Sequence, residues 1–379
     1  MTTLCKNCSK DISLKWLIEE KGTNCEQCSI CGQTDTIALN CEDNDLTQLF
    51  KALIRYYYSE WDYNTHWGGD GLEYLFDREN PILNYSSIID EDILNDAIMI
   101  MIDKVYEEYE EGVTLYAGYG DGGKQNMLLK SINSDFDYRL SRLNSKLNKK
   151  NYFLVEPEGI DLIQEYRSVL ESFVEENTQL FRARIGFSKN KTPLWGFGEE
   201  SHYKPYRNSD IGAPPPMKAN TGRMNRVGVS FLYLASDINT AISEVRPYPG
   251  QIVSTGIFKN KTRISVADFN SISILNYYKN DKLLDDFLLL KSIEKLFSQP
   301  IPPDKQHKYH LTQFISDILR KLGFEGIIFK SSLSLGTNLT IFDPDIFEYI
   351  EGTGSVSKVE KLQYAFSSLK LMEENELYM

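Results

Sequence analysis

The segment from residue 222 to residue 245 constrains the fold of this chain more than any other. It opens with a glycine-containing turn, and the apolar run Val227–Ala235 that follows is rich in strand-forming residues. Ser236 or Asp237 then supplies an N-cap, and apolar residues at helical spacing come next. A proline and a glycine end that pattern. We therefore expect a strand over 227–235 followed directly by a helix over 237–246.

Three polar side chains accompany this strand and helix. Arg223 lies in the turn before the strand, Tyr233 lies near the end of the strand, and Glu244 lies on the helix. Ligand pockets often form at strand ends and the elements next to them. Each residue also has an ordinary structural interpretation: Arg223 as a capping or ion-pairing group, Tyr233 as a core aromatic and Glu244 as a surface acid. The spacing alone indicates only a candidate site.

Short strand and helix patterns alternate throughout residues 176–350, which predicts an α+β domain. We expect strands near 180–187, 227–235, 251–258, 263–269, 325–330 and 338–343, and helices near 237–246, 284–297 and 311–322. Within the first strand, Phe181 and Ala183 alternate with Arg182 and Arg184, so the two arginines should share the opposite face. Such a face is most often solvated, although a guanidinium also suits a diphosphate because its planar fork donates two parallel hydrogen bonds.

This domain resembles the RES-domain family, which is named for a conserved Arg, Glu and Ser. The motifs occur in the family's order and cover about half of the chain. They are Phe181-Arg182; Gly222-Arg223-Met224-Asn225 with Gly228; Tyr233-Leu234-Ala235 with Thr240-Ala241 and Glu244; and Ser331-Ser332 with Asn338 and Phe342. One difference is the long segment between Arg182 and Gly222, which includes His202-Tyr203 and three successive prolines. We transfer no binding residue from the family to that segment.

The resemblance implies a fold similar to that of ADP-ribosyltransferase toxins, with NAD as the substrate. Members of the family degrade NAD, and many are the toxin half of bacterial toxin–antitoxin pairs. The chain would then cleave the nicotinamide–ribose bond and pass ADP-ribose to inorganic phosphate or to water, and the choice between these acceptors stays open. Two other functions also stay open: an ADP-ribosyltransferase that modifies a protein or nucleic acid, and a non-catalytic interaction protein.

The resemblance also assigns roles to individual residues. Catalytic roles fall to Arg182, Tyr233, Glu244 and Ser331, and substrate-binding roles to Arg184, Arg223, Asn225, Ser332 and Asn338. A carboxylate such as that of Glu244 would stabilise the oxocarbenium-like state that forms on the ribose as nicotinamide leaves. A serine hydroxyl at a strand end would position the nucleophile, and the Ser331-Ser332 doublet leaves open which of the two acts.

A cysteine-rich module occupies residues 1–41. Cys5 and Cys8 form one CxxC pair, Cys28 and Cys31 form another, and two such pairs are typical of a tetrahedral, structural zinc site. Cys25 and Cys41 are left over, and Cys25-x-x-Cys28 is a competing pair. Free thiols in a reducing compartment are the alternative interpretation.

Residues 42–175 should form a mainly helical domain, with a helix over 160–174, and a helical tail should follow over 351–379. The layout of 42–175 resembles the HEPN-like domain that precedes some RES domains. No arginine stands at the Arg-x₄₋₆-His spacing of HEPN ribonucleases, so we expect this domain to be non-catalytic and to bind a partner or to oligomerise. The glycine-rich stretch 118–125 misses a phosphate-binding P-loop by one residue, because Gln125 replaces the required Ser or Thr.

Composition limits the partners. The chain of 379 residues carries a net charge of −13, which disfavours a broad nucleic-acid surface and docking on anionic membranes. The N-terminus has no apolar signal run, and the longest strongly apolar stretch, 97–102, is too short to span a bilayer. We therefore expect a cytoplasmic protein. The family resemblance, not the composition, implies its partners: NAD, inorganic phosphate, an antitoxin or regulatory protein, or further copies of the chain.

Overall fold

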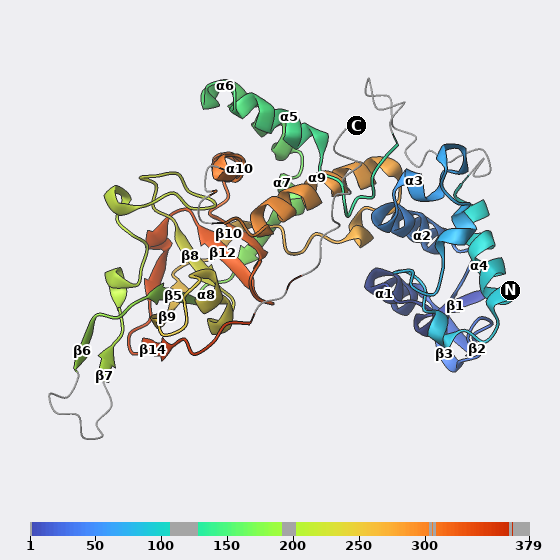
Figure 1. Cartoon of the computed structure of the whole chain (residues 1–379), viewed down its shortest axis with the longest axis horizontal. Helices are drawn as coiled ribbons and strands as arrows, with labels where there is room; N and C mark the ends of the chain where they lie inside the picture. The colour runs from blue at the N-terminus through green and yellow to red at the C-terminus, as the bar shows by residue number, and fades with distance from the viewer. Residues whose placement is uncertain are drawn as a thin grey trace, which may run out of the picture. The chain divides into compact units, whose positions relative to one another are not determined.

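A computed structural model describes residues 2–106, 128–191, 202–302, 305, 308–363 and 366. The chain divides into two compact units, each drawn in Figure 1. The N-terminal unit comprises residues 1–162 and 269–297, and the C-terminal unit comprises residues 163–268 and 298–379. The glycine-rich stretch 118–125 lies outside the described residues. Among the described helices, none combines the length and the apolar character needed to cross a membrane.

The N-terminal unit begins with a small antiparallel sheet of strand order β1-β3-β2. Its strands are β1 Thr3–Cys5, β2 Thr23–Gln27 and β3 Thr34–Asn40. Helix α1 (Ile12–Lys21) lies between the first two strands, and the side chain of Asp11 caps it by accepting from the backbone N–H groups of Ser13 and Leu14. This sheet and helix bring the two ends of the cysteine-rich module together.

Helices form most of the remaining N-terminal unit, as predicted. They are α2 Asn44–Tyr57, α3 Glu60–Tyr63, α4 Glu91–Asp103, α5 Tyr138–Leu147 and α6 Tyr152–Gln164, whose last two residues belong to the C-terminal unit. The predicted helix over 160–174 is wrong. Helix α6 ends at Gln164, the short α7 (Arg167–Leu170) follows, and residues 171–174 form strand β4 (Glu171–Val174) at the edge of a sheet.

Helix α9 (Asp281–Ser298) corresponds to the helix expected near 284–297, but it belongs to the N-terminal unit. Residues 269–297 leave the C-terminal unit and complete the N-terminal one. Asp281 pairs with Lys51 at 3.2 Å, and Ser292 Oγ accepts from the backbone N–H of Asp137 at 3.0 Å. The apolar stripe of α9 predicts burial but does not say against which unit, so the sequence pattern was compatible with both.

The C-terminal unit is built on a nine-stranded sheet of order β13-β9-β5-β8-β12-β11-β10-β4, with β14 paired to β9. All neighbours are antiparallel except β10 and β11. Besides β4, the strands are β5 Gln179–Ile185, β8 Leu232–Ala235, β9 Ile252–Asn260, β10 Ile264–Asp268, β11 Gly326–Lys330, β12 Thr337–Ile341, β13 Phe347–Tyr349 and β14 Ser355–Lys358. Helices α8 (Ile238–Glu244) and α10 (His310–Lys321) join it, and β6 (Lys189–Lys191) pairs with β7 (His202–Lys204) as a separate ribbon.

Two expected elements of this unit differ from the prediction. The strand expected over 227–235 starts only at Leu232, because the backbone before it folds on itself: the N–H of Gly228 bonds the carbonyl of Ala219. The helix expected over 351–379 does not form over 355–358, because these residues pair with the edge of β9 as strand β14. Most of the tail beyond 363 lies outside the described residues.

The two faces of the sheet are buried differently. Leu232, Leu234, Leu339 and Ile341 point to one face and form the main core of the unit. On the other face, a smaller cluster of Ala183, Ala235 and Val253 packs against Ala241 of helix α8. Small side chains at these positions let the helix approach the sheet closely, and they leave space beside it.

Candidate functional site

A pocket of about 410 Å³ opens where strands β5 and β8 separate. These two strands pair only through Phe181 and Ala235, whereas β5 pairs with its other neighbour, β9, over its full length. The pocket is lined by Phe181, Arg182, Ala183, Gly222, Arg223, Tyr233, Leu234, Ala235, Ala241, Glu244, Val245, Arg246, Ile301, Tyr309, Phe329 and Asn338. It therefore gathers residues from all four motifs that carry the resemblance to the RES-domain family.

Arg182 bridges the separated strands. Its guanidinium donates to the carbonyl oxygens of Ile211 at 2.5 Å, Tyr233 at 2.7 Å and Gly212 at 3.2 Å, so all three of its nitrogens contact backbone. Burial, and secondarily the charge of Arg184, lowers the pKa of Arg182 to about 10, which keeps the group protonated at neutral pH. The Tyr233 carbonyl lies on β8, so this side chain replaces part of the missing ladder between β5 and β8.

Glu244 stands at the end of helix α8, with its carboxylate held by two side chains from the β11–β12 hairpin. Ser331 Oγ and Asn338 Nδ2 each donate to Glu244 Oε1 at 2.7 Å. Both bonds reach the same oxygen, and within the described residues no hydrogen bond reaches Oε2. The carboxylate is thus fixed in orientation with one oxygen available to a ligand.

Ser331 does more than orient Glu244. Its Oγ also accepts from the backbone N–H groups of Leu333 and Ser334, both at 3.1 Å, so it caps the turn between β11 and β12. The neighbouring Ser332 hydroxyl is buried with no partner among the described residues, and Ser332 does not line the pocket. Of the serine doublet, Ser331 is the one in contact with Glu244.

The Gly222–Asn225 motif forms a tight loop whose hydrogen bonds converge on Asn225. The Asn225 amide donates to the carbonyls of Asn220, Arg226 and Val229 at 2.9–3.1 Å, and its oxygen accepts from Tyr233 Oη at 2.7 Å. Burial raises the pKa of Tyr233, so its hydroxyl stays protonated and able to donate. Asn225 and Tyr233 therefore shape the loop, and the Tyr233 ring forms a wall of the pocket.

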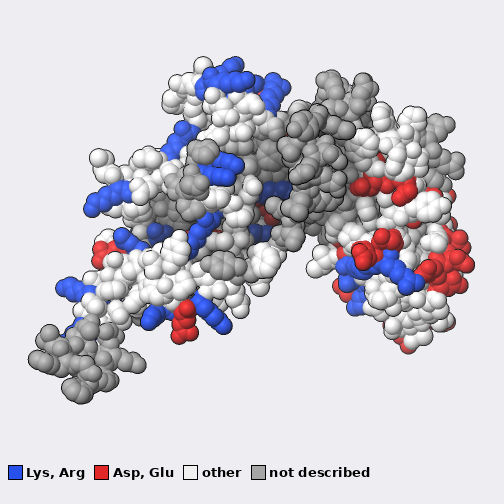
Figure 2. Space-filling model, in the orientation of Figure 1, with Lys and Arg blue, Asp and Glu red and all other residues white. Residues whose placement is uncertain are grey.

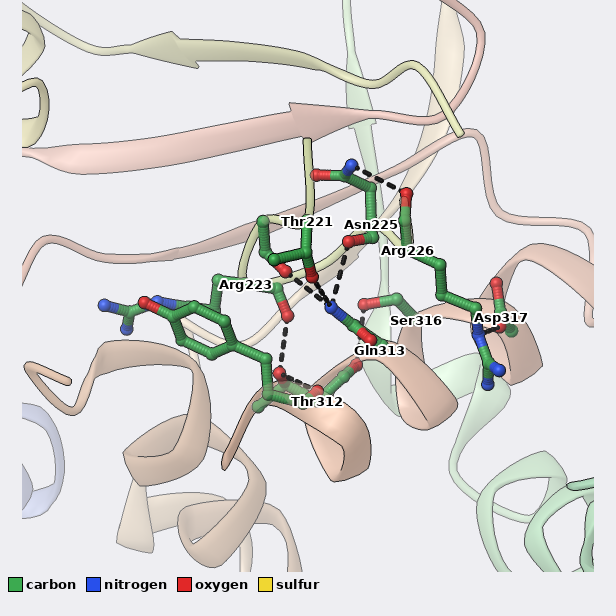
Figure 3. A network of polar contacts seen from close by, with 10 residues as sticks. Thr221, Arg223, Asn225, Arg226, Thr312, Gln313, Ser316 and Asp317 are labelled. Atoms are coloured by element: carbon green, nitrogen blue, oxygen red, sulfur yellow. Dashed lines mark hydrogen bonds and ion pairs between the residues drawn. The ribbon is translucent and has the colours of Figure 1, made fainter. Parts of the chain in front are cut away.

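Arg223 is the residue that this loop presents to the pocket. Its backbone carbonyl faces helix α10, while its side chain points away from Gln313 of that helix (Figure 3). Desolvation lowers the pKa of the Arg223 guanidinium, while the fields of Tyr309 and Glu244 raise it. The nearby carboxylate and the partly buried cation are thus electrostatically coupled, which suits a ligand that carries both positive and negative groups.

The structure does not bring every predicted residue to the pocket. Arg184 is exposed, donates to the carbonyl of Asp210 and stacks over the ring of Tyr206 at 4.8 Å. Two pocket residues were not anticipated. Arg246, two residues after Glu244, has a left-handed φ of 49°, donates to the Ile301 carbonyl at 3.0 Å, and adds an exposed cation to the partly buried one of Arg223. Tyr309 precedes α10 in a segment without recognisable motif, and only its fold position reveals it.

Comparison with known proteins identifies this region. Residues 193–365 match the family model of the RES domain. The chain contains a RES domain. The resemblance inferred from the four motifs is thereby confirmed, although the first of them, Phe181-Arg182, precedes the matched range. The matched range also runs through residues 269–297, which the structure places in the N-terminal unit.

Other comparisons add little to the RES domain assignment. No curated protein matches the chain. One solved structure with similarity is the crystal structure of the M. tuberculosis MbcT–MbcA toxin–antitoxin complex, at 10% identity, with 54% of this chain and 93% of that chain covered. The TM-score is 0.30, so the superposition is loose and the assignment rests on the family match.

A second site lies outside the RES domain, in the cysteine-rich module. The Sγ atoms of Cys5, Cys8, Cys28 and Cys31 all lie within 4.8 Å of one another, with separations of 3.8, 3.4 and 3.8 Å for the pairs 5–8, 5–31 and 8–28. A tetrahedral zinc with bonds of about 2.3 Å would set its sulfurs about 3.8 Å apart. Cys25 and Cys41 are outside this cluster, and Cys25 instead donates to the Gln27 carbonyl.

Proposed function

We propose that the RES domain degrades NAD by cleaving the bond between nicotinamide and ribose. The observation that carries this proposal is the Glu244 carboxylate, which Ser331 and Asn338 hold through one oxygen at the wall of a pocket that Arg223 also lines. A fixed anion beside cationic groups matches NAD, which joins a positively charged nicotinamide ring to a negatively charged diphosphate.

Glu244 would act on the sugar carbon. When the C–N bond breaks, its electron pair leaves with nicotinamide, which departs as a neutral molecule and needs no strong general acid. Positive charge then develops on the ribose, and a carboxylate already held in place stabilises it without reorganising. The oxygen of phosphate or water forms the new bond to that carbon, and ADP-ribose is transferred to it. Ser331 would serve mainly to aim Glu244.

Arg223, together with Arg246, is our candidate for the diphosphate. Both line the pocket, and guanidinium groups bind phosphate oxygens through paired hydrogen bonds. Arg182 is better explained as the group that bridges β5 and β8, because its nitrogens already contact three carbonyls. On the face shown in Figure 2, basic side chains lie over the C-terminal unit and over helices α5 and α6, while acidic ones gather over the rest of the N-terminal unit.

Structural zinc in the N-terminal unit is part of the same proposal. The sulfur separations of the four cysteines fit a tetrahedral ion, and four thiolates would leave no coordination position for a substrate. The ion would therefore join residues 5–8 to the turn before β3 and would take no part in the reaction. By the family resemblance, we further propose a toxin whose activity an antitoxin or regulatory protein restrains in the cytoplasm.

The deciding experiment measures NAD loss by the full chain, with and without inorganic phosphate, and identifies the products by mass. Wild type should consume NAD, and Glu244→Gln should lose nearly all of this activity. Glu348→Gln is the matched control, because Glu348 is an exposed acid of the same unit that pairs with Lys259 on the sheet edge. A phosphorylated ADP-ribose product would identify phosphorolysis, and free ADP-ribose would identify hydrolysis. Equal activity in wild type and Glu244→Gln would refute the proposal.

A further inference from the structure

Helix α10 buries polar side chains as well as its apolar stripe. Thr312 and Ser316 are almost completely buried, and Gln313 is 9% exposed. Buried polar side chains require partners, since an unpaired one costs the full desolvation of the group. Thr312 and Gln313 find those partners in the loop that carries Arg223, as Figure 3 shows, and Ser316 donates to the Thr312 carbonyl of its own helix.

Gln313 makes the central contacts. Its Nε2 donates to Thr221 Oγ1 at 2.9 Å, to the Gly222 carbonyl at 2.8 Å and to the Asn225 carbonyl at 2.9 Å (Figure 3). The last two acceptors flank Arg223 on either side, and they belong to residues already joined by a hydrogen bond from Gly222 N–H to the Asn225 carbonyl at 2.9 Å. The side-chain amide of Gln313 thus binds both ends of the loop to helix α10.

Neighbouring residues of α10 secure the rest of the loop. Thr312 Oγ1 donates to the Arg223 carbonyl, and Ser316 Oγ lies 3.3 Å from the sulfur of the buried Met224. One residue further along the helix, Asp317 pairs with Arg226 at 3.0 Å. The backbone around Arg223 therefore has little freedom, and the direction of its side chain follows from the position of α10.

We infer that Gln313 is a positioning residue that aims Arg223 into the pocket. This inference rests on the proposed function for its kinetic readout. Gln313 itself does not line the pocket, so it would act only through the loop backbone. A primary amide is well suited to this task, because it offers two N–H donors to carbonyl acceptors. A thioether offers none, and a carboxylate would face the same carbonyl oxygens with negative charge.

The kinetic test replaces Gln313 by Met, which has similar length and volume. Arg223 would bind the substrate's phosphates equally in ground state and transition state, so its misdirection should raise KM for NAD about 10- to 100-fold and leave kcat within about threefold. Gln313→Glu should have a larger effect in the same direction. Gln251→Met is the matched control, since its side chain only accepts from the backbone of Tyr248 in a turn away from the pocket.

A double-mutant cycle shows whether Gln313 works through Arg223. Arg223→Gln alone should raise KM, and adding Gln313→Met to it should change KM by less than twofold. If Gln313 had a merely structural role, Gln313→Met would raise KM by the same factor in wild type and in Arg223→Gln. Additive effects, or a wild-type KM in Gln313→Met, would overturn the inference. If Gln313→Met does not fold, Gln313→Asn, which keeps the amide but shortens its reach, takes its place in the cycle.

A second readout is independent of catalysis. Hydrogen exchange of the amides from 222 to 226 should be at least tenfold faster in Gln313→Met, and the reaction of Arg223 with an arginine-selective dicarbonyl reagent should change rate, with Gln251→Met unchanged in both. If wild type does not consume NAD, the proposed function fails while these measurements still judge the positioning role. Unchanged exchange and unchanged modification would refute that role even if NAD is consumed.

Discussion

Replacing Gly222 by alanine is the sharpest test of the loop that carries Arg223. A Cβ at this position would lie 2.3 Å from Asn225 Oδ1 and 2.7 Å from Tyr233 Oη, both far inside van der Waals contact. Asn225 cannot simply turn aside, because its amide donates to three carbonyls in a site that is 5% exposed. The hydrogen bond between Tyr233 and Asn225 should therefore break.

The magnitude follows from two costs. A buried tyrosine hydroxyl left without its acceptor costs about 1–3 kcal/mol, and forcing a methyl group into a packed site costs about 1–3 kcal/mol. We expect Gly222→Ala to lower the free energy of unfolding of the C-terminal unit by about 2–6 kcal/mol in total, a large part of the stability of an ordinary domain. The KM for NAD should rise as well, since the backbone beside Arg223 must shift.

Hydrogen exchange read by mass spectrometry along a urea series measures this loss in each unit separately. Gly228→Ala is the control: Gly228 has a positive φ of 80° but no atom within 4 Å of a new Cβ, so alanine there meets backbone strain of about 1 kcal/mol and no clash. If Gly222→Ala destabilises the unit no more than Gly228→Ala, the packing of Gly222 against Asn225 and Tyr233 is not as described.

Three further predictions concern the site and the metal. Asn338→Ala and Ser331→Ala should each lower kcat for NAD about 10- to 100-fold, because each removes one hydrogen bond to the charged Glu244. Only Ser331→Ala should also lower the melting temperature, since Ser331 caps the turn between β11 and β12. Equal losses of stability in the two variants would contradict this. Burial raises the folded-state pKa of Tyr233 above the unfolded value of about 10, so the contribution of Tyr233 to stability is present below pH 10 and declines above it. From pH 8 to 11, the free energy of unfolding should therefore fall less steeply for Tyr233→Phe than for wild type. Parallel curves would argue against a buried hydroxyl. Removal of metal by a strong chelator, or Cys8→Ser, should unfold the sheet of the N-terminal unit, and metal analysis of the full chain should return about one zinc per chain; intact exchange protection after chelation would refute a structural ion.

The candidate site was largely predictable because short motifs encode it. Glu244, Ser331 and Asn338 are far apart in the sequence, yet the pairing of β12 with β8 and β11 brings Ser331 and Asn338 within hydrogen-bond distance of Glu244. Strand periods and caps also located the sheet, with five of the six expected strands found close to their predicted bounds. The four clustered cysteines follow from their paired spacing in the same way.

Contacts to backbone atoms could not be predicted. Arg182 binds carbonyls at 211 and 212, which no side-chain pattern marks, so a residue expected to touch substrate is found bridging two strands. Gln313 was hidden for the same reason: the apolar stripe of α10 predicted its buried side, whereas its polar contacts depend on how a distant loop folds. The sequence also did not predict that residues 269–297 belong to the N-terminal unit, because the pattern of an amphipathic helix does not identify what the helix packs against.

Because residues 269–297 complete the N-terminal unit, the two units finish folding in a particular order during synthesis. Chains fold as they leave the ribosome, N-terminal parts first, but here the first unit lacks α9 until residue 297 has emerged. By then Arg182, Arg223 and Glu244 have already been made, while Ser331 and Asn338 have not. The N-terminal unit can therefore be complete before the pocket is. For the same reason, a fragment that begins at residue 163 would contain α9 without the rest of the N-terminal unit. Phe287, Ile293 and Phe297, which are buried in the full chain, would then be exposed, and the fragment should aggregate.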